Sequence, residues 1–123
     1  MNKRFINEIT CGDCEQLVQE LDDDSIDLLI TSPPYNVNLG FNKKHKNPYD
    51  LYQDNLPYQE YLEWLKSIFG KVKDKMVTGG RVCINIGDKA NGSVPTHSDI
   101  IQFMTHELSY VLMTTLVWNK NQT

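Results

Sequence analysis

One short stretch of the chain brings together groups that could bind a flat, amino-substituted ring. It is Thr31-Ser32-Pro33-Pro34-Tyr35, and it follows directly on the apolar run Ile26–Ile30. Consecutive prolines lack backbone donors and restrict the residue before them, so the chain must leave the run in a stiff, extended turn. That turn presents a hydroxyl, an unblocked carbonyl and an aromatic ring, those of Ser32, Pro33 and Tyr35. Two acceptors and a stacking ring suit a nucleobase that carries an exocyclic amine.

The turn needs a strand to position it, and the apolar pattern predicts four strands. They are expected at Phe5–Cys11, Ile26–Ile30, Val82–Ile86 and Tyr110–Trp118. Helices are expected between them, so the strands should form a mostly parallel, doubly wound α/β sheet with flanking helices. In open sheets of this kind, ligand sites lie at the carboxyl ends of the strands, which is where the double-proline turn begins.

The expected helices have recognisable starts. Asp13 stands at an N-cap position, with apolar residues at helical spacing behind it. Pro57 suits the first position of a long helix whose apolar stripe extends to Met76, before Gly79-Gly80 breaks the pattern. A third helix is expected to begin at Pro95-Thr96. Helix starts and strand ends therefore alternate along most of the chain.

These segments resemble a known family. Ser-Pro-Pro-Tyr looks like the (Asp/Asn/Ser)-Pro-Pro-(Tyr/Phe) motif of S-adenosylmethionine-dependent amino-methyltransferases, most closely the DNA cytosine-N4 and adenine-N6 enzymes of restriction–modification systems. Three other stretches are similar to that family's cofactor-contacting, pocket-lining and Trp-x-Lys segments. They are residues 9–14, 79–88 and 116–120. The resemblance therefore spans nearly the whole chain and implies a partial Rossmann-like methyltransferase fold.

The order of the segments resembles one permuted group of that family. In this group the catalytic motif lies near the amino terminus, and a Phe-x-Gly-x-Gly cofactor loop follows a target-recognition region. The 123 residues contain neither Phe-x-Gly-x-Gly nor any Gly-x-Gly. Residues 1–123 are therefore expected to be the amino-terminal catalytic portion, which is inactive alone and either needs a complementing carboxyl-terminal segment or self-associates.

The resemblance implies a mechanism for the double-proline turn. An exocyclic amine is a poor nucleophile because its lone pair is delocalised, and acceptors that bind its hydrogens favour the geometry needed for attack. By resemblance, the Ser32 hydroxyl and the Pro33 carbonyl are those acceptors, Pro34 stiffens the turn, and Tyr35 stacks on a base flipped out of double-stranded DNA. The alternative is a purely structural double-proline turn.

The resemblance also assigns cofactor and pocket residues. The residues expected to bind S-adenosylmethionine are Gly12, Asp13 and Thr31. Asn85 and Asp88 follow a strand and are expected to line the target-base pocket. The alternatives are that Asp13 simply caps a helix and that Asn85 and Asp88 form an Asx turn around Gly87.

Two other clusters have both a functional and a structural interpretation. Cys11 and Cys14 have a redox or zinc spacing, but zinc needs four ligands and no second pair is nearby, so no metal is expected and buried free cysteines are favoured. Lys43–Lys46 lies in the long loop of residues 36–56, which shows no periodicity. It could contact DNA phosphates or form a solvated loop face.

Bulk composition limits the partners. The net charge of −4 gives this segment no electrostatic attraction for DNA, although a separate recognition region could supply it. No apolar stretch is long enough to span a membrane and no signal-peptide core is present, so no membrane partner is expected and the cytoplasm is the expected compartment. Three cysteines agree with a reducing environment.

The leading hypothesis is a DNA amino-methyltransferase in which cytosine N4 is favoured over adenine N6, because serine precedes the prolines. One alternative is a non-catalytic or truncated α/β module that needs a complementing chain. A less favoured alternative is a protein-glutamine methyltransferase. Those enzymes carry Asn-Pro-Pro-Tyr with an upstream cofactor domain, for which the thirty-one residues before Ser32 leave too little room.

Overall fold

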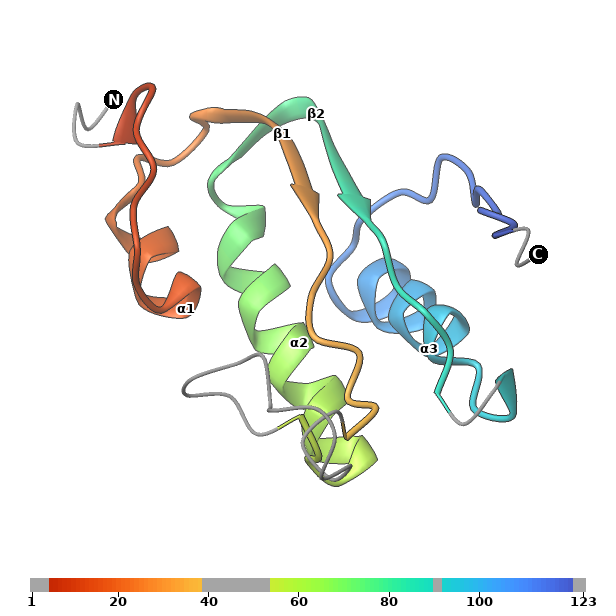
Figure 1. Cartoon of the computed structure of the whole chain (residues 1–123). Helices are drawn as coiled ribbons and strands as arrows, with labels where there is room; N and C mark the ends of the chain where they lie inside the picture. Colours follow the sequence, from red (N-terminus) through yellow and green to blue (C-terminus); the bar gives the residue numbers. More distant parts are fainter. Residues whose placement is uncertain (1–4, 39–53, 90–91, 121–123) are drawn as a thin grey trace.

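The computed structural model describes residues 5–38, 54–89 and 92–120, and these residues form an α/β structure. Its centre is a parallel sheet of two strands, β1 (Ile26–Thr31) and β2 (Met76–Ile84). Helix α2 (Tyr58–Lys73) connects them, and helix α3 (Thr96–Gln102) follows β2. Figure 1 shows both helices lying along the sheet. The predicted α/β class with flanking helices is thus confirmed.

The two strands are in one-to-one register where they approach the double-proline turn. Leu29, Ile30 and Thr31 pair with Val82, Cys83 and Ile84. Because side chains alternate across a strand, Leu29, Val82 and Ile84 pack against the helices. The strand predicted at Ile26–Ile30 is confirmed. The one predicted at Val82–Ile86 is confirmed in part, since β2 begins earlier and ends at Ile84.

Helix α2 supplies most of the core. Pro57 precedes its first residue, where the missing backbone N–H costs nothing. Its buried stripe consists of Tyr61, Leu65, Phe69 and Val72. The helix ends at Lys73, however, so the expected extension of the stripe to Met76 is wrong. Met76 and both glycines of Gly79-Gly80 lie in β2, because a bulged strand tolerates glycine.

Helix α3 packs against α2 and contributes the rest of the core. It begins at Thr96, as predicted, and continues into a π-helical turn, η4 (Phe103–Glu107). Ile100, Phe103 and Met104 are buried against the α2 stripe. Trp64 is partly buried at the edge of this cluster. The core therefore lies on one face of the sheet, between the strands and the two helices.

The amino-terminal helix is short. Helix α1 (Cys14–Leu17) is capped by Asp13, whose carboxylate accepts a hydrogen bond from the Glu15 amide, and a 3-10 turn, η2 (Val18–Glu20), follows it. The predicted N-cap is confirmed. Glu15 also forms an ion pair with Lys71 of α2 at 2.5 Å, which attaches this segment to the long helix.

Two predicted strands are wrong. Residues 5–11 and 110–118 form no strand, although they are within the described part of the chain. A strand is stable only when a neighbour takes its backbone hydrogen bonds, and β1 and β2 are the strands that the described residues provide. Val111, Leu116 and Trp118 are accordingly exposed. The alternating pattern alone could not reveal whether a neighbour is present.

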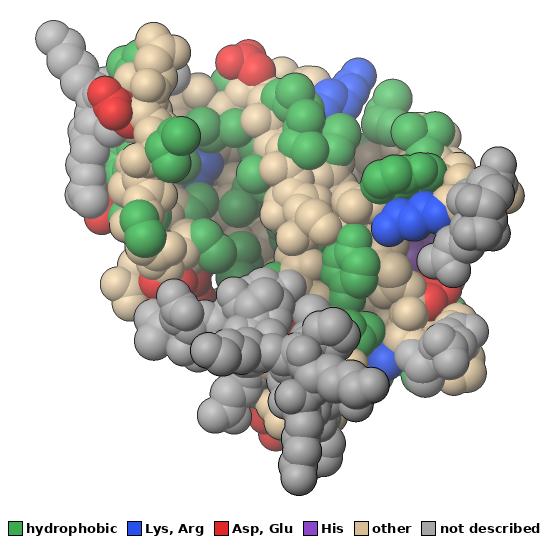
Figure 2. All heavy atoms as spheres, in the orientation of Figure 1, with side chains coloured by type: hydrophobic (Ala, Val, Ile, Leu, Met, Phe, Trp, Pro, Cys, Tyr) green, Lys and Arg blue, Asp and Glu red, His purple; other side chains and the backbone are tan. Residues whose placement is uncertain are grey.

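The outer face of the sheet is apolar and uncovered by the described residues. Leu28 is 53% exposed and Ile30 is 72% exposed. Figure 2 shows apolar side chains at the surface over β1 and β2. The cysteines Cys11, Cys14 and Cys83 are free but exposed, so the expectation that Cys11 and Cys14 are buried is wrong. Cys83 lies on the same outer face because it alternates with Val82 and Ile84.

Candidate functional site at the carboxyl end of the sheet

The double-proline turn and the segment after β2 start from the same edge of the sheet. Thr31, the last residue of β1, pairs with Ile84. The backbone N–H of Asn85 donates to the Thr31 carbonyl at 2.9 Å, which extends the ladder by one more bond. Ser32 and Asn85 therefore leave adjacent strands at the same level. This is the end of a parallel sheet at which ligands bind.

Three side chains at this edge form one polar cluster, which consists of Ser32, Tyr35 and Asn85. The Ser32 hydroxyl lies 3.1 Å from the Tyr35 hydroxyl. The Asn85 amide nitrogen donates to the same Tyr35 oxygen at 3.2 Å. Ser32 and Asn85 are exposed and Tyr35 is half-buried. Three of the residues predicted for the site are thus in contact with each other.

Gly87 leaves room for the Tyr35 ring. A Cβ at position 87 would lie 3.2 Å from both Cδ2 and Cε2 of Tyr35, which is closer than most such contacts allow. Any larger residue at this position would press on the ring and displace it. The sequence signal was the glycine inside the pocket-lining stretch, and close backbone approach is a common reason for such a glycine.

The hydroxyl of Tyr61 binds the double-proline turn. Tyr61 of α2 is fully buried, and its hydroxyl donates to the Pro34 carbonyl at 2.7 Å. Among the described residues, nothing donates a hydrogen bond to the Pro33 carbonyl. Tyr61 was expected only as part of the apolar stripe. The general preference of buried tyrosines for a hydroxyl partner was the signal that could have identified it.

The chain after Tyr35 is held by Asp54. The Asp54 carboxylate accepts from the backbone amides of Asn36 at 2.9 Å and Val37 at 3.2 Å, and Asp54 is 3% exposed. Asn36 is fully buried with a left-handed backbone, which asparagine tolerates better than most residues. Its amide nitrogen donates to the Leu56 carbonyl. Because this chain reversal directly follows Tyr35, it determines the position of the Tyr35 ring.

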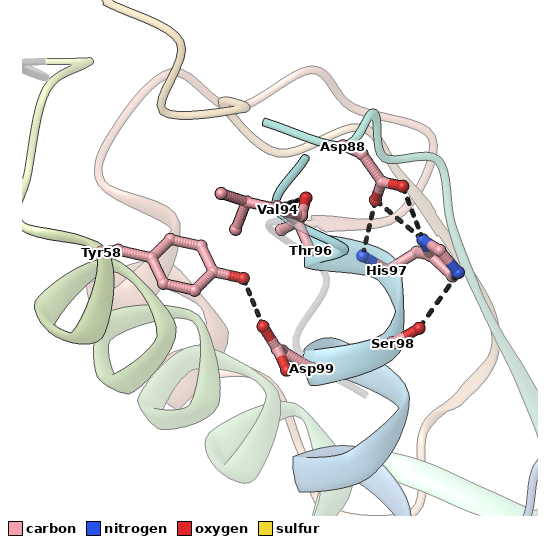
Figure 3. A network of polar contacts seen from close by, with 7 residues as sticks. All are labelled: Tyr58, Asp88, Val94, Thr96, His97, Ser98 and Asp99. Atoms are coloured by element: carbon pink, nitrogen blue, oxygen red, sulfur yellow. Dashed lines mark hydrogen bonds and ion pairs between the residues drawn. The ribbon is translucent and has the colours of Figure 1, made fainter. Parts of the chain in front are cut away.

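Asp88 makes a different set of contacts. Its carboxylate accepts from the backbone amide of His97 at 3.1 Å and lies 2.7 Å from His97 Nδ1 (Figure 3). The hydrogen bond from His97 lowers the pKa of Asp88 below its usual value. The pair joins the segment after β2 to the start of α3. A nine-residue separation carries no recognisable motif, so no signal in the sequence identifies this pair.

Figure 3 also shows how α2 meets α3. The Tyr58 hydroxyl donates to the Asp99 carboxylate at 2.5 Å. Burial, followed by this hydrogen bond, raises the pKa of Tyr58 to about 12. Thr96, the first residue of α3, is fully buried beside them. These contacts hold the start of α3, which carries the partner of Asp88, against α2.

The residues predicted to bind the cofactor make local contacts. Asp13 is exposed and caps α1, as described above. A Cβ on Gly12 would lie 2.9 Å from Leu17 Cδ1, so a larger residue there would displace the end of the Leu17 side chain. Thr31 closes β1 and accepts the Asn85 hydrogen bond. Within the described part of the chain, no hydrogen bond or ion pair joins Gly12 or Asp13 to the Ser32 cluster.

Three further expectations concern a metal site, a membrane span and the basic cluster. Within residues 5–38, 54–89 and 92–120, no group of three or more potential ligands could hold a metal ion. No helix in those ranges is long and apolar enough to cross a bilayer. Lys43–Lys46 lies outside the described residues, so the expectation for that cluster stays a prediction.

The fold and this site define a class of protein. A double-proline turn follows strand β1 of an α/β structure, and residues 26–123 match a family model described as DNA methylase, of the N6/N4 methyltransferase kind. The match covers most of the chain, including β1, the turn, β2 and α3. The chain belongs to this DNA methylase family.

Curated relatives of the chain are named type II methyltransferases. The type II methyltransferase M.MjaVI of Methanocaldococcus jannaschii is 36% identical over 117 residues, which cover 94% of this chain and 56% of the relative. M.BglII of Bacillus subtilis is 33% identical over 91 residues, 74% of this chain and 22% of the relative. M.MjaI of Methanocaldococcus jannaschii is 30% identical, with 93% of this chain and 45% of the relative covered. The chain therefore spans about half the length of M.MjaVI and less of the others.

Proposed function

We propose that this chain supplies the catalytic turn of a DNA methyltransferase that transfers a methyl group from S-adenosylmethionine to an exocyclic base amine. Cytosine N4 is favoured over adenine N6, and a restriction–modification system in the cytoplasm is the expected setting. Residues 1–123 would be the amino-terminal catalytic portion, in the permuted order of motifs. The observation that carries the proposal is the cluster of Ser32, Tyr35 and Asn85 at the carboxyl end of β1 and β2, in a chain of the DNA methylase family.

The roles of the turn follow from which atoms are occupied. The Pro34 carbonyl is engaged by Tyr61, whereas nothing among the described residues donates to the Pro33 carbonyl. The Pro33 carbonyl and the Ser32 hydroxyl are therefore the acceptors for the two amine hydrogens. They favour pyramidal nitrogen and stabilise the positive charge that develops on it. The nitrogen gains the methyl group and loses one proton, which water can take because Ser32 is exposed.

Tyr35 would stack on a base flipped out of double-stranded DNA. Its ring is half-buried beside Gly87 and its position is limited by two hydrogen bonds at its hydroxyl. A ring held in this way loses little freedom when a base stacks on it. Asn85 and Asp88 remain proposed pocket residues, with Asp88 acting from its pair with His97.

The cofactor fits the described residues only in part. S-adenosylmethionine supplies an electrophilic methyl group, and the exposed carboxylate of Asp13 could accept from its hydroxyl or amino groups. Gly12 lies beside the Leu17 side chain, and Thr31 contributes backbone at the end of β1. We therefore derive no step from a cofactor position. The remaining cofactor contacts would come from a complementing segment, equivalent to the part of M.MjaVI that the chain does not cover.

A chimera tests the proposal. In M.MjaVI, the part aligned with this chain is replaced by this chain, and methyl transfer from labelled S-adenosylmethionine to duplex DNA is measured. The chimera should methylate DNA, and nuclease digestion should yield N4-methylcytosine. Ser32→Ala should lower kcat with little change in DNA affinity, because the bond strengthens in the transition state. An active Ser32→Ala chimera with unchanged kcat would remove Ser32 from the chemistry.

The chain without the complementing segment gives a second test. It should be inactive and show no saturable micromolar binding of S-adenosylmethionine in calorimetric titration. Saturable binding by the chain alone would mean that residues assigned other roles here build the cofactor site. The two tests together address the non-catalytic alternative. If the chain were a non-catalytic module, the chimera would be inactive as well as the isolated chain.

A further inference from the structure

We propose that Asn85 is a positioning residue of the methyl-transfer site, which holds Tyr35 by its hydroxyl and through it sets the hydrogen bonding of Ser32. The inference rests on the proposed function and changes the role of Asn85 within it. Asn85 was expected to contact the base in the pocket. Its amide nitrogen instead donates to the Tyr35 hydroxyl oxygen.

The direction of the bonds follows from which groups carry hydrogens. An amide –NH2 group donates and does not accept, so the Tyr35 oxygen is the acceptor of the Asn85 bond. The phenol has one proton, and the Ser32 oxygen lies 3.1 Å away. Because the Tyr35 oxygen already accepts from Asn85, we assign its proton to the bond with Ser32. The bonds then run in one direction, from Asn85 to Tyr35 to Ser32.

This direction leaves Ser32 ready to accept. A serine oxygen has two lone pairs. One accepts from Tyr35, and the second remains for a hydrogen of the base amine. The serine proton is then directed away from both. Tyr35 thus stacks on the base with its ring and orients the catalytic hydroxyl with its own.

The backbone makes the arrangement stiff. The Asn85 N–H donates to Thr31, the residue directly before Ser32, so the two ends of the relay are joined by a ladder hydrogen bond as well. Gly87 follows two residues after Asn85 and leaves room for the ring on its Cδ2–Cε2 side. The segment after β2 therefore determines where both the ring and the hydroxyl of Tyr35 lie. A phenylalanine in place of Tyr35 would keep the ring and break the relay.

Carbon NMR on the full chain tests the relay without any need for activity. Tyrosine is labelled at Cζ and serine at Cβ, with Tyr35→Phe and Ser32→Ala used for assignment. Asn85→Ala should shift the signals of both Tyr35 and Ser32. Gln59→Ala, which removes an exposed amide on α2, should shift neither. In the Tyr35→Phe background, Asn85→Ala should no longer shift Ser32, because the hydroxyl that connects them is absent.

Asn85→Asp is the sharper variant, since it keeps the shape and removes the donor. Its carboxylate would accept the Tyr35 proton and take it from Ser32, so the Ser32 signal should shift at neutral pH and return toward the wild-type position when acid protonates the new carboxyl. If Asn85→Ala left both signals in place, or shifted Ser32 equally in the Tyr35→Phe background, the relay would not exist.

Methyl transfer by the chimera gives the functional arm. A lost neutral hydrogen bond should reduce kcat about 3- to 10-fold in Asn85→Ala with KM nearly unchanged. The loss should disappear when the same change is made in the Tyr35→Phe chimera. A loss that persists there would identify Asn85 as a base contact and overturn the positioning role. An inactive wild-type chimera would contradict the proposed function, and the NMR shifts would still decide the relay.

Discussion

Tyr61→Phe removes the hydroxyl that holds the double-proline turn and leaves the fully buried ring in place. No apolar area is lost, so the cost is the hydrogen bond to Pro34 and the desolvation of a part-buried carbonyl that no longer has this donor. A neutral bond contributes about 0.5–1.5 kcal/mol, and an orphaned buried partner adds to that, so we expect about 1–2 kcal/mol. For 123 residues, this corresponds to a fall in Tm of roughly 3–8 °C.

Urea unfolding and amide NMR of the full chain check this expectation together. The free energy of unfolding should fall, and the amide signals of Ser32, Tyr35 and Asn36 should move because the turn shifts. Tyr58→Phe is the matched control, since it removes a hydroxyl from the same helix that donates to Asp99 instead. It should lower stability while leaving the amide signals of the turn in place. A Tyr61→Phe chain within about 0.5 kcal/mol of wild type, the scatter of neutral substitutions, and with unmoved signals would refute the reasoning.

Three other expectations concern the surroundings of the site. Asp54→Ala should cost about 2–4 kcal/mol in urea unfolding, because two backbone amides lose a charged acceptor, whereas Asp23→Ala, at an exposed ion pair, should cost less than about 1 kcal/mol. The pKa of Asp88 is lowered in the folded chain. The Asp88–His97 pair therefore stabilises the fold at a pH above the ordinary pKa of 3.8, and this stabilisation is lost as the pH falls through the lowered pKa. His97→Ala should therefore flatten the decline of stability on acidification, and an unchanged decline would remove the pair from the acid response. Ile30→Lys, on the exposed sheet face, should reduce self-association of the isolated chain in sedimentation velocity, and equal association would place the contact elsewhere.

Local patterns predicted the elements that the described residues can complete by themselves. The run Ile26–Ile30, the start of α2 and the start of α3 each carry a local signal, which is an apolar run or a proline. The stretches 5–11 and 110–118 carry equally good patterns but form no strand. A strand depends on its neighbour, and the neighbour is not encoded in the stretch itself.

The residues of the site also divide into those with a local sequence signal and those without one. Ser32 and Tyr35 could be identified from the turn itself, and Asn85 from its place after a strand. The supports of the turn could not, because Tyr61 and Asp54 act from positions 27 and 18 residues away in the chain from the groups they bind. Tyrosine in an apolar stripe and aspartate in an aperiodic loop have many possible partners. Which partner each one takes is decided by the packing of α2 against the sheet.

The bulge in the sheet bears on how this chain can change in length. Between its pairs with Ile26 and Leu28, β2 advances from Met76 to Arg81, with Gly79 in a left-handed conformation. From Leu28 onward the two strands match residue for residue up to Thr31. An insertion or deletion at the bulge would be absorbed at the end of the sheet opposite Ser32, where the register is already irregular. The same change between Arg81 and Asn85 would rotate every following side chain to the other face and separate Asn85 from Tyr35. Natural length variation should therefore accumulate at the bulge, where it leaves the alignment of the catalytic turn untouched.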